Sequence, residues 1–405
     1  MNGFPTKTIE AVTLDLIDYR GKTPTKTADG VKLITAKVVK DGFIQDGEHE
    51  YIAESDYDAW MRRGLPKQWD ILITTEAPLG EVAQLRTPER IALAQRIILL
   101  RGDPNLIDQA YYFHALKSPF VQSGLKARSS GTTVLGIKQS ELRQVEIPYP
   151  PLPIQQRIAS ILSAYDDLIE NNTRRIMILE DMARMLYREW FVNFRFPGHR
   201  KVKFVESELG PIPEGWKLSD FGSLSINLDS KRIPLSKMQR ASHDRRYAYY
   251  GASGIIDKVE SYLFDGLHLL ISEDGENLRS RKTPISFLAD GKFWVNNHAH
   301  VVQGRPPVST LYLFACLKTT DISPYLTGTA QPKLSQANLN RIPVLRPRDA
   351  VLRAFEALHT PILTLVDALV RKNANLRTTR DFLLPKLMSG EISVEAAAEL
   401  VEQTA

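Results

Sequence analysis

The sequence predicts an α+β protein in which two similar α/β-mixed globules are joined by two long antiparallel helices. The main observation is a repeat. SGTT at 130–133 and TGTA at 327–330 each precede a matching series of apolar residues, and equivalent positions such as Gly131 and Gly328 lie 197 residues apart. A repeat of this size is a duplicated domain with its helix, because solenoid units are far shorter. We therefore expect a pseudo-two-fold internal duplication.

The same spacing continues without a gap into the predicted helices. The matched pairs are Ile137 and Leu334, Leu142 and Leu339, Ile147 and Val344, Ile158 and Phe355, Leu168 and Leu365, and Leu186 and Leu383.

The composition agrees with two ordinary cores. The chain has 405 residues, of which 43% are hydrophobic, enough for two cores of about 150 residues each. The formal charge of +5 weakly favours an anionic partner. The single cysteine, Cys316, excludes intrachain disulfides and a cysteine zinc site. No apolar stretch approaches the ~20 residues that span a bilayer, and the first residues do not resemble a signal peptide, so we expect a cytoplasmic protein.

Residues 1–151 form the first predicted globule. Apolar runs at 31–35, 70–74 and 96–101 are typical of strands, and residues 109–117 are typical of a short helix. A proline cluster at 148–153 ends the globule, because proline restricts the preceding residue and donates no backbone hydrogen bond.

The region 152–197 contains the first predicted long helix. From Ile154 to about Phe194, apolar positions alternate in steps of four and three, which is a heptad seam. The seam consists of Ile158, Leu162, Tyr165, Ile169, Asn172, Ile176, Leu179, Ala183 and Leu186. A second apolar row, Ile161, Leu168 and Met182, is expected to widen it. Such a helix is ~57 Å long at 1.5 Å per residue, which is too long for the core of one domain.

Residues 198–348 form the second predicted globule, and 349–390 contain the second long helix. Strand-like runs at 267–272, 285–288 and 293–295 and a helical pattern at 312–318 repeat the α+β plan. An apolar face from Asp349 to about Leu384 predicts the helix, with Phe355, Leu358, Ile362, Leu365, Leu369, Leu376 and Leu383 on it. The tail, 391–405, is short, acidic and Ala-rich, and its sequence supports no prediction.

Two amphipathic helices that each bury one face are expected to pack on each other. Because a whole globule separates them in the chain, antiparallel packing into a coiled-coil rod is the simplest arrangement. Asn172 and Asn373 lie within the apolar seams. They either form a buried pair that sets the helix register or lie at the edge of the seam in water.

The chain resembles the specificity subunit of type I restriction-modification systems along nearly its whole length. The matching segments are YRGKTP at 19–24, ITAKVVKDGFI at 34–44, DILITTEAPLG at 70–80, PLPIQQRI at 151–158, YYGASGII at 249–256, ISEDGEN at 271–277 and VNNHAH at 295–300. Their order around the duplicated helices is specific to that family.

The resemblance implies two target-recognition domains, each reading one half of an asymmetric bipartite DNA sequence, with the helix pair as a ruler for the unread spacer. It implies a subunit without catalytic activity that directs adenine-N6 methylation or restriction by its partners. Those implied partners are double-stranded DNA, two methyltransferase subunits that hold S-adenosylmethionine, and two restriction subunits that translocate and cut DNA with ATP and Mg. No cofactor or metal is expected on this chain.

The residues themselves form no catalytic motif. Pro148-Tyr-Pro-Pro lacks the amide or carboxylate of an adenine methyltransferase motif, and Arg20-Gly-Lys-Thr23 has Leu16 where a phosphate loop needs its first glycine. His298 and His300 have strand spacing for two metal ligands, but no third ligand lies nearby in sequence. Glu273 and Asp274 are explained as well by turn chemistry as by acid and base catalysis.

We expect DNA contacts from basic and polar clusters, because Arg and Lys recognise guanine and phosphate, and Asn and Gln recognise adenine. In the first globule the candidates are Arg20, Lys22, Thr23, Lys126, Arg128, Ser129, Ser130, Thr132 and Lys138. In the second globule they are Lys231, Arg232, Asn277, Arg279, Arg281, Lys282, Asn296, Asn297, Thr329, Gln331 and Lys333. The repeated Gly loops are the expected phosphate sites, although an ordinary tight turn before a strand also accounts for them.

A competing class is a coiled-coil scaffold or adaptor whose globules never read DNA. The two classes differ in whether the protein prefers one bipartite sequence over random duplex. A stand-alone hydrolase would need a nucleophile next to a base, and the sequence offers no convincing pair.

Overall fold

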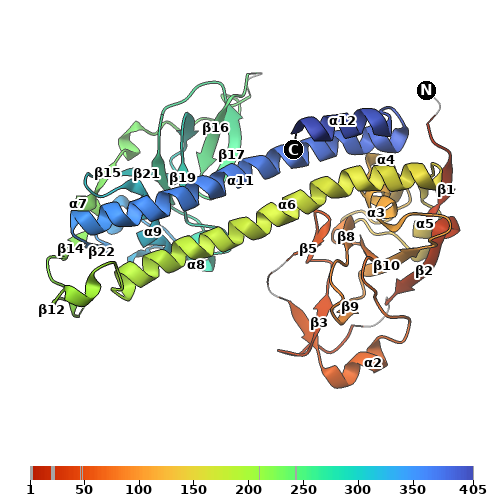
Figure 1. Ribbon diagram of the computed structural model, residues 1–405, viewed down its shortest axis with the longest axis horizontal. Helices are drawn as coiled ribbons and strands as arrows, with labels where there is room; N and C mark the ends of the chain where they lie inside the picture. The colour runs from red at the N-terminus through yellow and green to blue at the C-terminus, as the bar shows by residue number, and fades with distance from the viewer. Residues whose placement is uncertain are drawn as a thin grey trace. The chain divides into compact units, whose positions relative to one another are not determined.

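The computed structural model describes residues 3–19, 23–45, 47, 49–208, 210–241 and 244–404, with side chains up to residue 399. The chain divides into two compact units, Met1–Asn172 with Arg371–Ala405, and Thr173–Val370. Each unit contains one globule and a segment of both long helices (Figure 1). Among the described residues, no helix combines the length and apolarity needed to cross a bilayer.

The first unit is built on a four-stranded antiparallel sheet in the order β2-β10-β7-β8. A three-stranded sheet, β6-β3-β9, contains one parallel pair, β3 with β9, and β1 pairs with β11. The strands are β1 (Thr6–Thr8), β2 (Thr13–Asp18), β3 (Val31–Ile34), β4 (Val39–Lys40), β5 (Phe43–Ile44), β6 (Glu50–Ile52), β7 (Ile71–Thr75), β8 (Leu79–Gln84), β9 (Ile91–Leu93), β10 (Ile97–Gly102) and β11 (Glu146–Pro148). The globule's helices are α1 (Ile9–Val12), α2 (Tyr57–Trp60), α3 (Gln109–Lys117), α4 (Pro119–Ala127) and α5 (Gln139–Arg143).

Both faces of the four-stranded sheet are buried, which explains the continuous apolar runs that predicted its strands. Ile73 and Ile98 lie in a core cluster shared with α3 and with the two long helices. Leu72 and Leu99 lie in a second cluster with β3, β9 and α2. A strand that is covered on both faces needs apolar residues at successive positions.

The second unit repeats this plan with the same strand order. Its four-stranded antiparallel sheet is β15-β21-β18-β19, its three-stranded sheet β17-β16-β20 pairs β16 with β20 in parallel, and β14 pairs with β22. The strands are β12 (Phe204–Val205), β13 (Ile212–Pro213), β14 (Lys217–Asp220), β15 (Ser225–Asn227), β16 (Tyr247–Gly251), β17 (Gly254–Val259), β18 (His268–Ser272), β19 (Ser286–Ala289), β20 (Phe293–Val295), β21 (Ala299–Gly304) and β22 (Pro343–Arg346). The helices are α7 (Phe221–Leu224), α8 (Asn277–Ser280), α9 (Thr310–Thr319) and α10 (Gln336–Asn340).

The short elements predicted from the sequence are confirmed to within two residues at each end. The predicted strands correspond to β3, β7, β10, β18, β19 and β20, and the predicted short helices correspond to α3 and α9.

The long helices differ from the prediction mainly at their ends. The first, α6 (Leu152–Tyr187), is shorter than the predicted pattern, because the chain changes into a π-helical turn, η2 (Arg188–Val192). This turn buries Trp190 and Phe191 in the core cluster that the second unit shares with the long helices. The second, α11 (Asp349–Ser389), continues past the predicted end near Leu384 and through Pro385. Leu387 and Met388 are buried in the core cluster that the first unit shares with the long helices, and this burial stabilises the last turn of α11.

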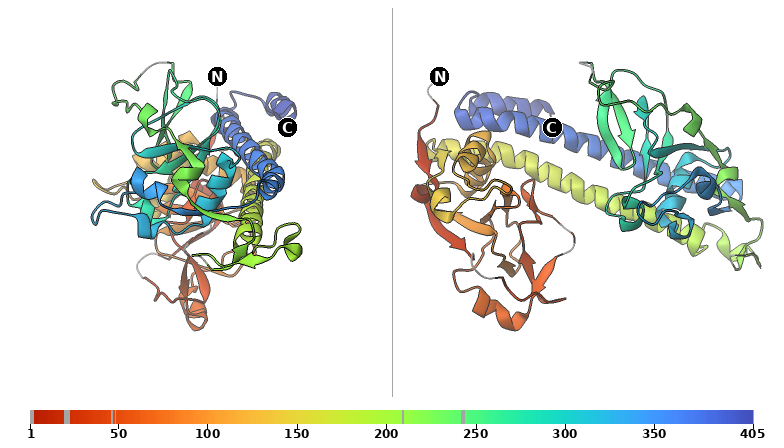
Figure 2. Two further views of the ribbon diagram at one scale, coloured as in Figure 1. Left: turned by 90° about the vertical axis from the view of Figure 1, so that its left-hand side faces the viewer. Right: turned by 180° about the vertical axis from the view of Figure 1, so that it is seen from behind.

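The C-terminal tail, for which the sequence supports no prediction, contains a helix. The helix α12 (Val394–Thr404) folds back beside α11 (Figures 1 and 2). It buries Val394 and Ala397 in the first core, and Glu395 forms an ion pair with Arg157 of α6 at 2.6 Å. The glutamates at 395, 399 and 402 recur in steps of four and three, so the tail has the sequence pattern of an amphipathic helix.

The buried seam is narrower than predicted. On α6, Ile158, Leu162 and Ile169 are at most 2% exposed, as predicted. The prediction that a second apolar row widens the seam is wrong. Leu168 and Met182 are 37% and 49% exposed, and only Ile161 of this row packs against the core. The expected apolar face of α11 is likewise wrong at two of its positions. Leu358 and Leu365 are exposed on α11.

Within each unit the helix segments run antiparallel. In the first unit Asn172 Nδ2 donates to Asn373 Oδ1 at 3.0 Å, and both side chains are buried, so the buried alternative for this pair is confirmed. Further along, Asp166 of α6 meets Arg380 of α11. In the second unit the rings of Trp190 and Phe191 lie 6.0 and 4.9 Å from that of Phe355, at the start of α11.

A buried charged cluster joins α3 to both helices in the first unit. Asp166 Oδ1 accepts from Arg380 Nη1 at 2.5 Å, and Lys117 Nζ and His114 Nδ1 lie 3.7 and 3.9 Å from Asp166 Oδ2. Burial acts to raise the pKa of Asp166, but the positive charges of Lys117 and Arg380 outweigh it, so the pKa is lowered. Burial lowers the pKa of His114 to about 3, which keeps its imidazole neutral.

The Asn172–Asn373 pair is expected to behave as one unit in unfolding. Asn172→Ala should lower the free energy of unfolding by about 1–3 kcal/mol, because the buried Asn373 amide loses its side-chain partner. Replacing both residues with Ala should lower the free energy of unfolding by less than the sum of the two single alanine changes, since no unpaired amide is then left in the seam. A double-mutant cycle in urea measures this difference, and simple additivity would contradict the pairing.

The cluster also predicts a dependence of stability on pH. Because the folded pKa of His114 lies below its unfolded value of about 6.5, its stabilising contribution is complete above that pH and is lost as the pH falls toward 3. Between pH 7.5 and 5, His114→Gln should therefore lose about 2 kcal/mol less unfolding free energy than the wild type. Equal losses in urea titrations at the two pH values would show that His114 is not held neutral.

Candidate nucleic-acid interface

The repeated Gly loops have the same backbone geometry in the two units. Ser130 and Gly136 exchange backbone hydrogen bonds at 2.8 and 2.9 Å, and Thr327 and Lys333 exchange them at 2.8 Å each. The residue that follows each loop donates its backbone N–H to a carbonyl at the end of the equivalent strand of the large sheet, β7 in the first unit and β18 in the second. Ile137 N–H bonds Thr75 O at 3.0 Å, and Leu334 N–H bonds Glu273 O at 2.8 Å. The repeat seen in the sequence is thus a repeated loop at one sheet edge.

Glycine is required in both loops. Gly131 and Gly328 have φ of +114° and +83°, a region that side chains with Cβ rarely adopt. A Cβ at Gly131 would lie 2.1 Å from Val134 O, and one at Gly328 would lie 2.2 Å from Gln331 O. The tight backbone therefore explains why this residue is the same in both copies.

Both loops leave backbone donors open to an anion. Among the residues that the structure describes, no hydrogen bond uses the N–H groups of 131–135 or of 328–331. Thr132 and Thr329, directly after the glycines, are exposed. Successive unbonded N–H groups in a Gly turn with hydroxyl side chains form the usual concave site for a phosphate oxygen.

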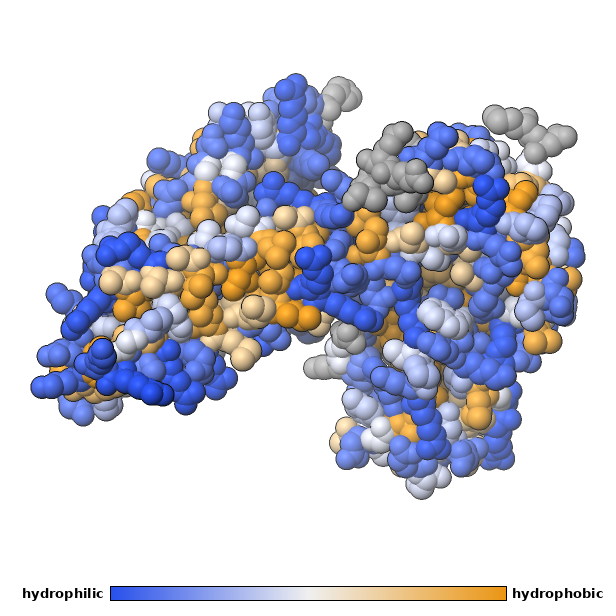
Figure 3. Space-filling view, viewed as in Figure 1, coloured by the Kyte–Doolittle hydropathy of each residue, from blue (hydrophilic) through white to orange (hydrophobic). Residues whose placement is uncertain are grey.

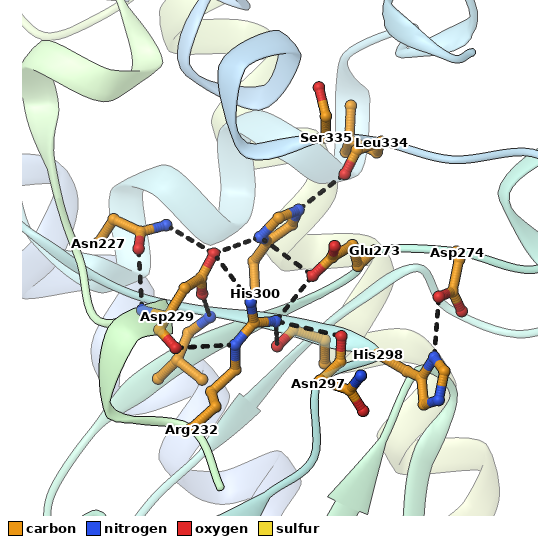
Figure 4. A network of polar contacts seen from close by, with 12 residues as sticks. Asn227, Asp229, Arg232, Glu273, Asp274, Asn297, His298, His300, Leu334 and Ser335 are labelled. Atoms are coloured by element: carbon orange, nitrogen blue, oxygen red, sulfur yellow. Dashed lines mark hydrogen bonds and ion pairs between the residues drawn. The ribbon is translucent and has the colours of Figure 1, made fainter. Parts of the chain in front are cut away.

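A carboxylate contacts a basic side chain beside each loop. In the first unit Arg96 Nε lies 2.8 Å from Glu76 Oε1, and in the second His298 Nδ1 lies 2.8 Å from Asp274 Oδ2 (Figure 4). Glu76 forms a β-bridge with Gly136, and Asp274 forms one with Lys333, so each acidic residue contacts its loop. Both pairs are partly exposed and are therefore worth at most about 1 kcal/mol to the fold.

In the first unit these groups line a pocket of about 340 Å³. Its wall consists of Thr75, Glu76, Gln95, Arg96, Ser130, Val134, Gly136, Ile137 and Lys138. Thr23 lies next to it, with Oγ1 3.4 Å from Gln95 Oε1. Most of these side chains are donors or acceptors, so the pocket suits a polar ligand edge better than an apolar one.

A network of polar side chains inside the second unit holds the strand end to which the second loop is bonded (Figure 4). Arg232 donates to Glu273 Oε2 and to the carbonyl of Ala299, both at 2.8 Å. Burial acts to raise the pKa of Glu273, but the hydrogen bond from Arg232 and the nearby positive charges outweigh it, so the pKa is lowered. The network holds the strand end that anchors Leu334, and it assigns Arg232 a structural role.

The structure gives no support to a metal site at His298 and His300. His300 Nδ1 lies 2.6 Å from Asp229 Oδ2 and its Nε2 lies 2.7 Å from Leu334 O, so both ring nitrogens are occupied. Within the described ranges, no group of three or more His, Cys, Asp or Glu side chains could hold a metal ion.

The predicted DNA-contact residues fall into three groups, and their contact with DNA stays a prediction. Arg20 and Lys22 lie outside the described residues. Side chains on the surface are Thr23, Lys126, Arg128, Ser130, Thr132, Lys138, Lys231, Arg281, Lys282, Asn297, Thr329, Gln331 and Lys333. Side chains engaged within the fold are Ser129, which donates to Lys126 O, Arg232 in its network, Asn277, which bonds the backbone of Thr283, Arg279, and Asn296, which accepts from His298 N–H.

Sequence reasoning missed Glu76, Gln95 and Arg96, and it assigned Asp274 and His298 to other chemistry. These residues lie far from the loops in the chain and reach them only through the strand register of the sheet. No spacing in the sequence reports that register.

Two α+β units that carry the same Gly loop at the same sheet edge define an internally repeated protein. Residues 63–180 and 213–350 match the family described as type I restriction modification DNA specificity domain. The chain therefore belongs to this family, as the resemblance predicted.

Relatives and solved structures agree with this assignment. The chain is 27% identical over 373 residues to the type I restriction enzyme MjaIX specificity subunit of Methanocaldococcus jannaschii, covering 87% of this chain and 84% of that protein. It is 31% identical over 205 residues to the MjaVIII specificity subunit of the same organism, covering 50% and 46%. Its fold is similar to the crystal structure of a type I restriction-modification system S subunit from M. genitalium, with a TM-score of 0.59, 16% identity, and coverage of 95% and 96%.

Arg279 is expected to hold the second loop in place. Its Nη1 and Nη2 donate to Thr329 O and Gly328 O at 2.8 and 2.5 Å. Arg279→Ala removes both bonds, so hydrogen exchange of the Thr327 and Lys333 amides should become about tenfold faster. The loop at 130–136 serves as an internal control, and Arg281→Ala, a change at an exposed neighbour, should leave both loops unchanged. Unaltered exchange in Arg279→Ala would contradict this role.

Proposed function

We propose that the chain is the DNA sequence-recognition subunit of a type I restriction-modification complex. Each globule acts as a target-recognition domain and reads one half of an asymmetric bipartite sequence. The observation that carries the proposal is the repeated Gly loop, which offers the same phosphate chemistry in two copies of one fold. Two copies of one binding module suit a ligand that itself has two similar parts.

The division of labour within each globule follows from its chemistry. The loops, with Ser130, Thr132, Lys138 and their counterparts Thr329, Gln331 and Lys333, hold the DNA backbone, which positions the protein without reading sequence. Lys126 and Arg128 extend this basic surface along α4, and Lys231, Arg281 and Lys282 extend it in the second globule. Base edges are read by side chains next to the loops.

The two long helices are proposed to form an antiparallel coiled-coil rod that fixes the unread spacer between the half-sites. The proposed division is 1–151 and 198–348 for the recognition domains, 152–197 and 349–390 for the helices, and 391–405 for the tail. The identical strand orders and the 197-residue repeat support an internal duplication with pseudo-two-fold symmetry.

The proposed partners are double-stranded DNA, two methyltransferase subunits with S-adenosylmethionine, and two restriction subunits with ATP and Mg, in the cytoplasm. The chain itself is proposed to be non-catalytic and without a cofactor. Exposed apolar side chains on α6, including Met177, Ile178, Met182 and Met185, support a protein partner on the helices, since such surface is costly in water (Figure 3).

The test is a base-resolution map of N6-methyladenine in cells that express this chain with its methyltransferase subunit, compared with cells that lack the chain. We expect a new asymmetric motif of two short blocks at a constant interval. Identical maps with and without the chain would contradict the proposed function. Expression of the methyltransferase subunit alone is the matched control.

A further inference from the structure

The two residues before β10 in the first globule are structurally equivalent to the two residues before β21 in the second globule. Ile98 of β10 pairs with Ile73, and His300 of β21 pairs with Ile271. Counting back two residues from these equivalent positions leads to Arg96 in the first unit and to His298 in the second. The residues before them are Gln95 and Asn297.

Each globule therefore presents an amide residue followed by a basic residue, and each basic residue is paired with a carboxylate. Glu76 and Asp274 lie three residues beyond Ile73 and Ile271, so they too are equivalent. The pairs have the same separation, 2.8 Å, although Arg96 with Glu76 and His298 with Asp274 differ chemically. The backbone positions are equivalent in the two globules, whereas the side chains on them differ. This is the pattern expected of positions that set sequence specificity.

All of these side chains except Asn297 lie beside the loops that are proposed to hold the DNA backbone, and Asn297 directly precedes His298 in the chain. Glu76 bridges Gly136 in the first loop, and Gln95 and Arg96 line the same pocket as Ser130 and Lys138. Asp274 bridges Lys333 in the second loop. A side chain next to a bound phosphate is within reach of the groove edges of the adjoining base pairs.

The exposure and chemistry of these groups suit base recognition. The Arg96 and His298 side chains are 49% and 50% exposed, so their polar atoms are open to a ligand. Arginine binds guanine through two hydrogen bonds, and the amides of Gln and Asn bind adenine in the same way. The carboxylate partner favours one orientation of each basic side chain before DNA arrives, and a partly exposed contact of this strength is readily exchanged for a contact with a base.

We infer that Gln95 with Arg96, and Asn297 with His298, are the equivalent base-reading pairs of the two globules. This inference rests on the proposed function and adds to it the residues that set specificity. It predicts that a change in one pair alters one block of the recognised motif and leaves the other block and the spacer unchanged.

The experiment uses the full chain in complex with its methyltransferase subunit, first for the motif in cells and then for methylation rates on duplexes with single base-pair changes. Arg96→Gln should reduce discrimination at one base pair of one block by about 5- to 100-fold. His298→Gln should do the same in the other block. Lys138→Gln is the matched control, because loss of a phosphate contact should slow methylation of all duplexes alike.

Arg96→Lys separates base reading from a structural role. Lysine keeps the charge beside Glu76 but lacks the two-pronged geometry, so discrimination should fall while the unfolding midpoint stays unchanged. The inference is overturned if the Arg96 variants retain the wild-type discrimination at every position, or if they lose activity equally at all positions. Absence of any bipartite motif with the wild-type chain would instead overturn the proposed function itself.

Discussion

In each unit one hydrophobic core cluster depends on the two long helices. Ile158 and Leu162 of α6 and Leu383 and Leu387 of α11 complete the first core. The π-helical turn after α6 and Phe355 of α11 complete the second. Helices of 36 and 41 residues with one apolar stripe each are held by such packing and not by helix propensity alone. A change in the helix register would therefore disturb the globules as well as the helices.

The two units reach the same fold with different side chains. In the first unit α3 meets the helices through the buried charges of His114, Lys117 and Asp166. In the second unit the equivalent helix α9 meets them through Tyr312, whose ring lies 5.0 Å from that of Phe191 and packs on Phe355. The backbone frame and the Gly loop are common to both copies, while the groups at the sheet edge differ. In the proposed function, this separation lets one architecture hold DNA in one way and read two different blocks.

Much of the fold could be predicted from the sequence, because hydrophobic period and proline or glycine punctuation report local structure. Four strands of the large sheets, β7, β10, β18 and β19, together with α3, α9 and the two long helices, are of this kind. The sequence did not reveal the exposed row at Leu168 and Met182, since a periodic pattern does not show which of two apolar rows finds a partner. Pro385 within α11 and the helix α12 were missed because tertiary packing outweighs local propensity there.

The candidate site was predicted in part. The loops at 130–136 and 327–333 were found because their glycines recur, whereas Arg96 and Glu76 depend on strand register, which no local pattern contains. Arg232 and Arg279 were predicted to contact DNA, and in the structure they also hydrogen-bond within the fold, because a basic residue near a polar loop is as able to hold the loop as to bind a ligand.

The most direct test of the account is to lengthen both helices by one turn. Insertion of four residues within 174–184 and four within 360–370, between the Asn172–Asn373 pair and the Phe355 cluster, adds ~6 Å to each helix. The methylated motif should then keep both blocks and gain one to two base pairs of spacer, at about 3.4 Å per pair. A motif with an unchanged spacer would contradict the claim that the paired helices set the interval between two independently read blocks.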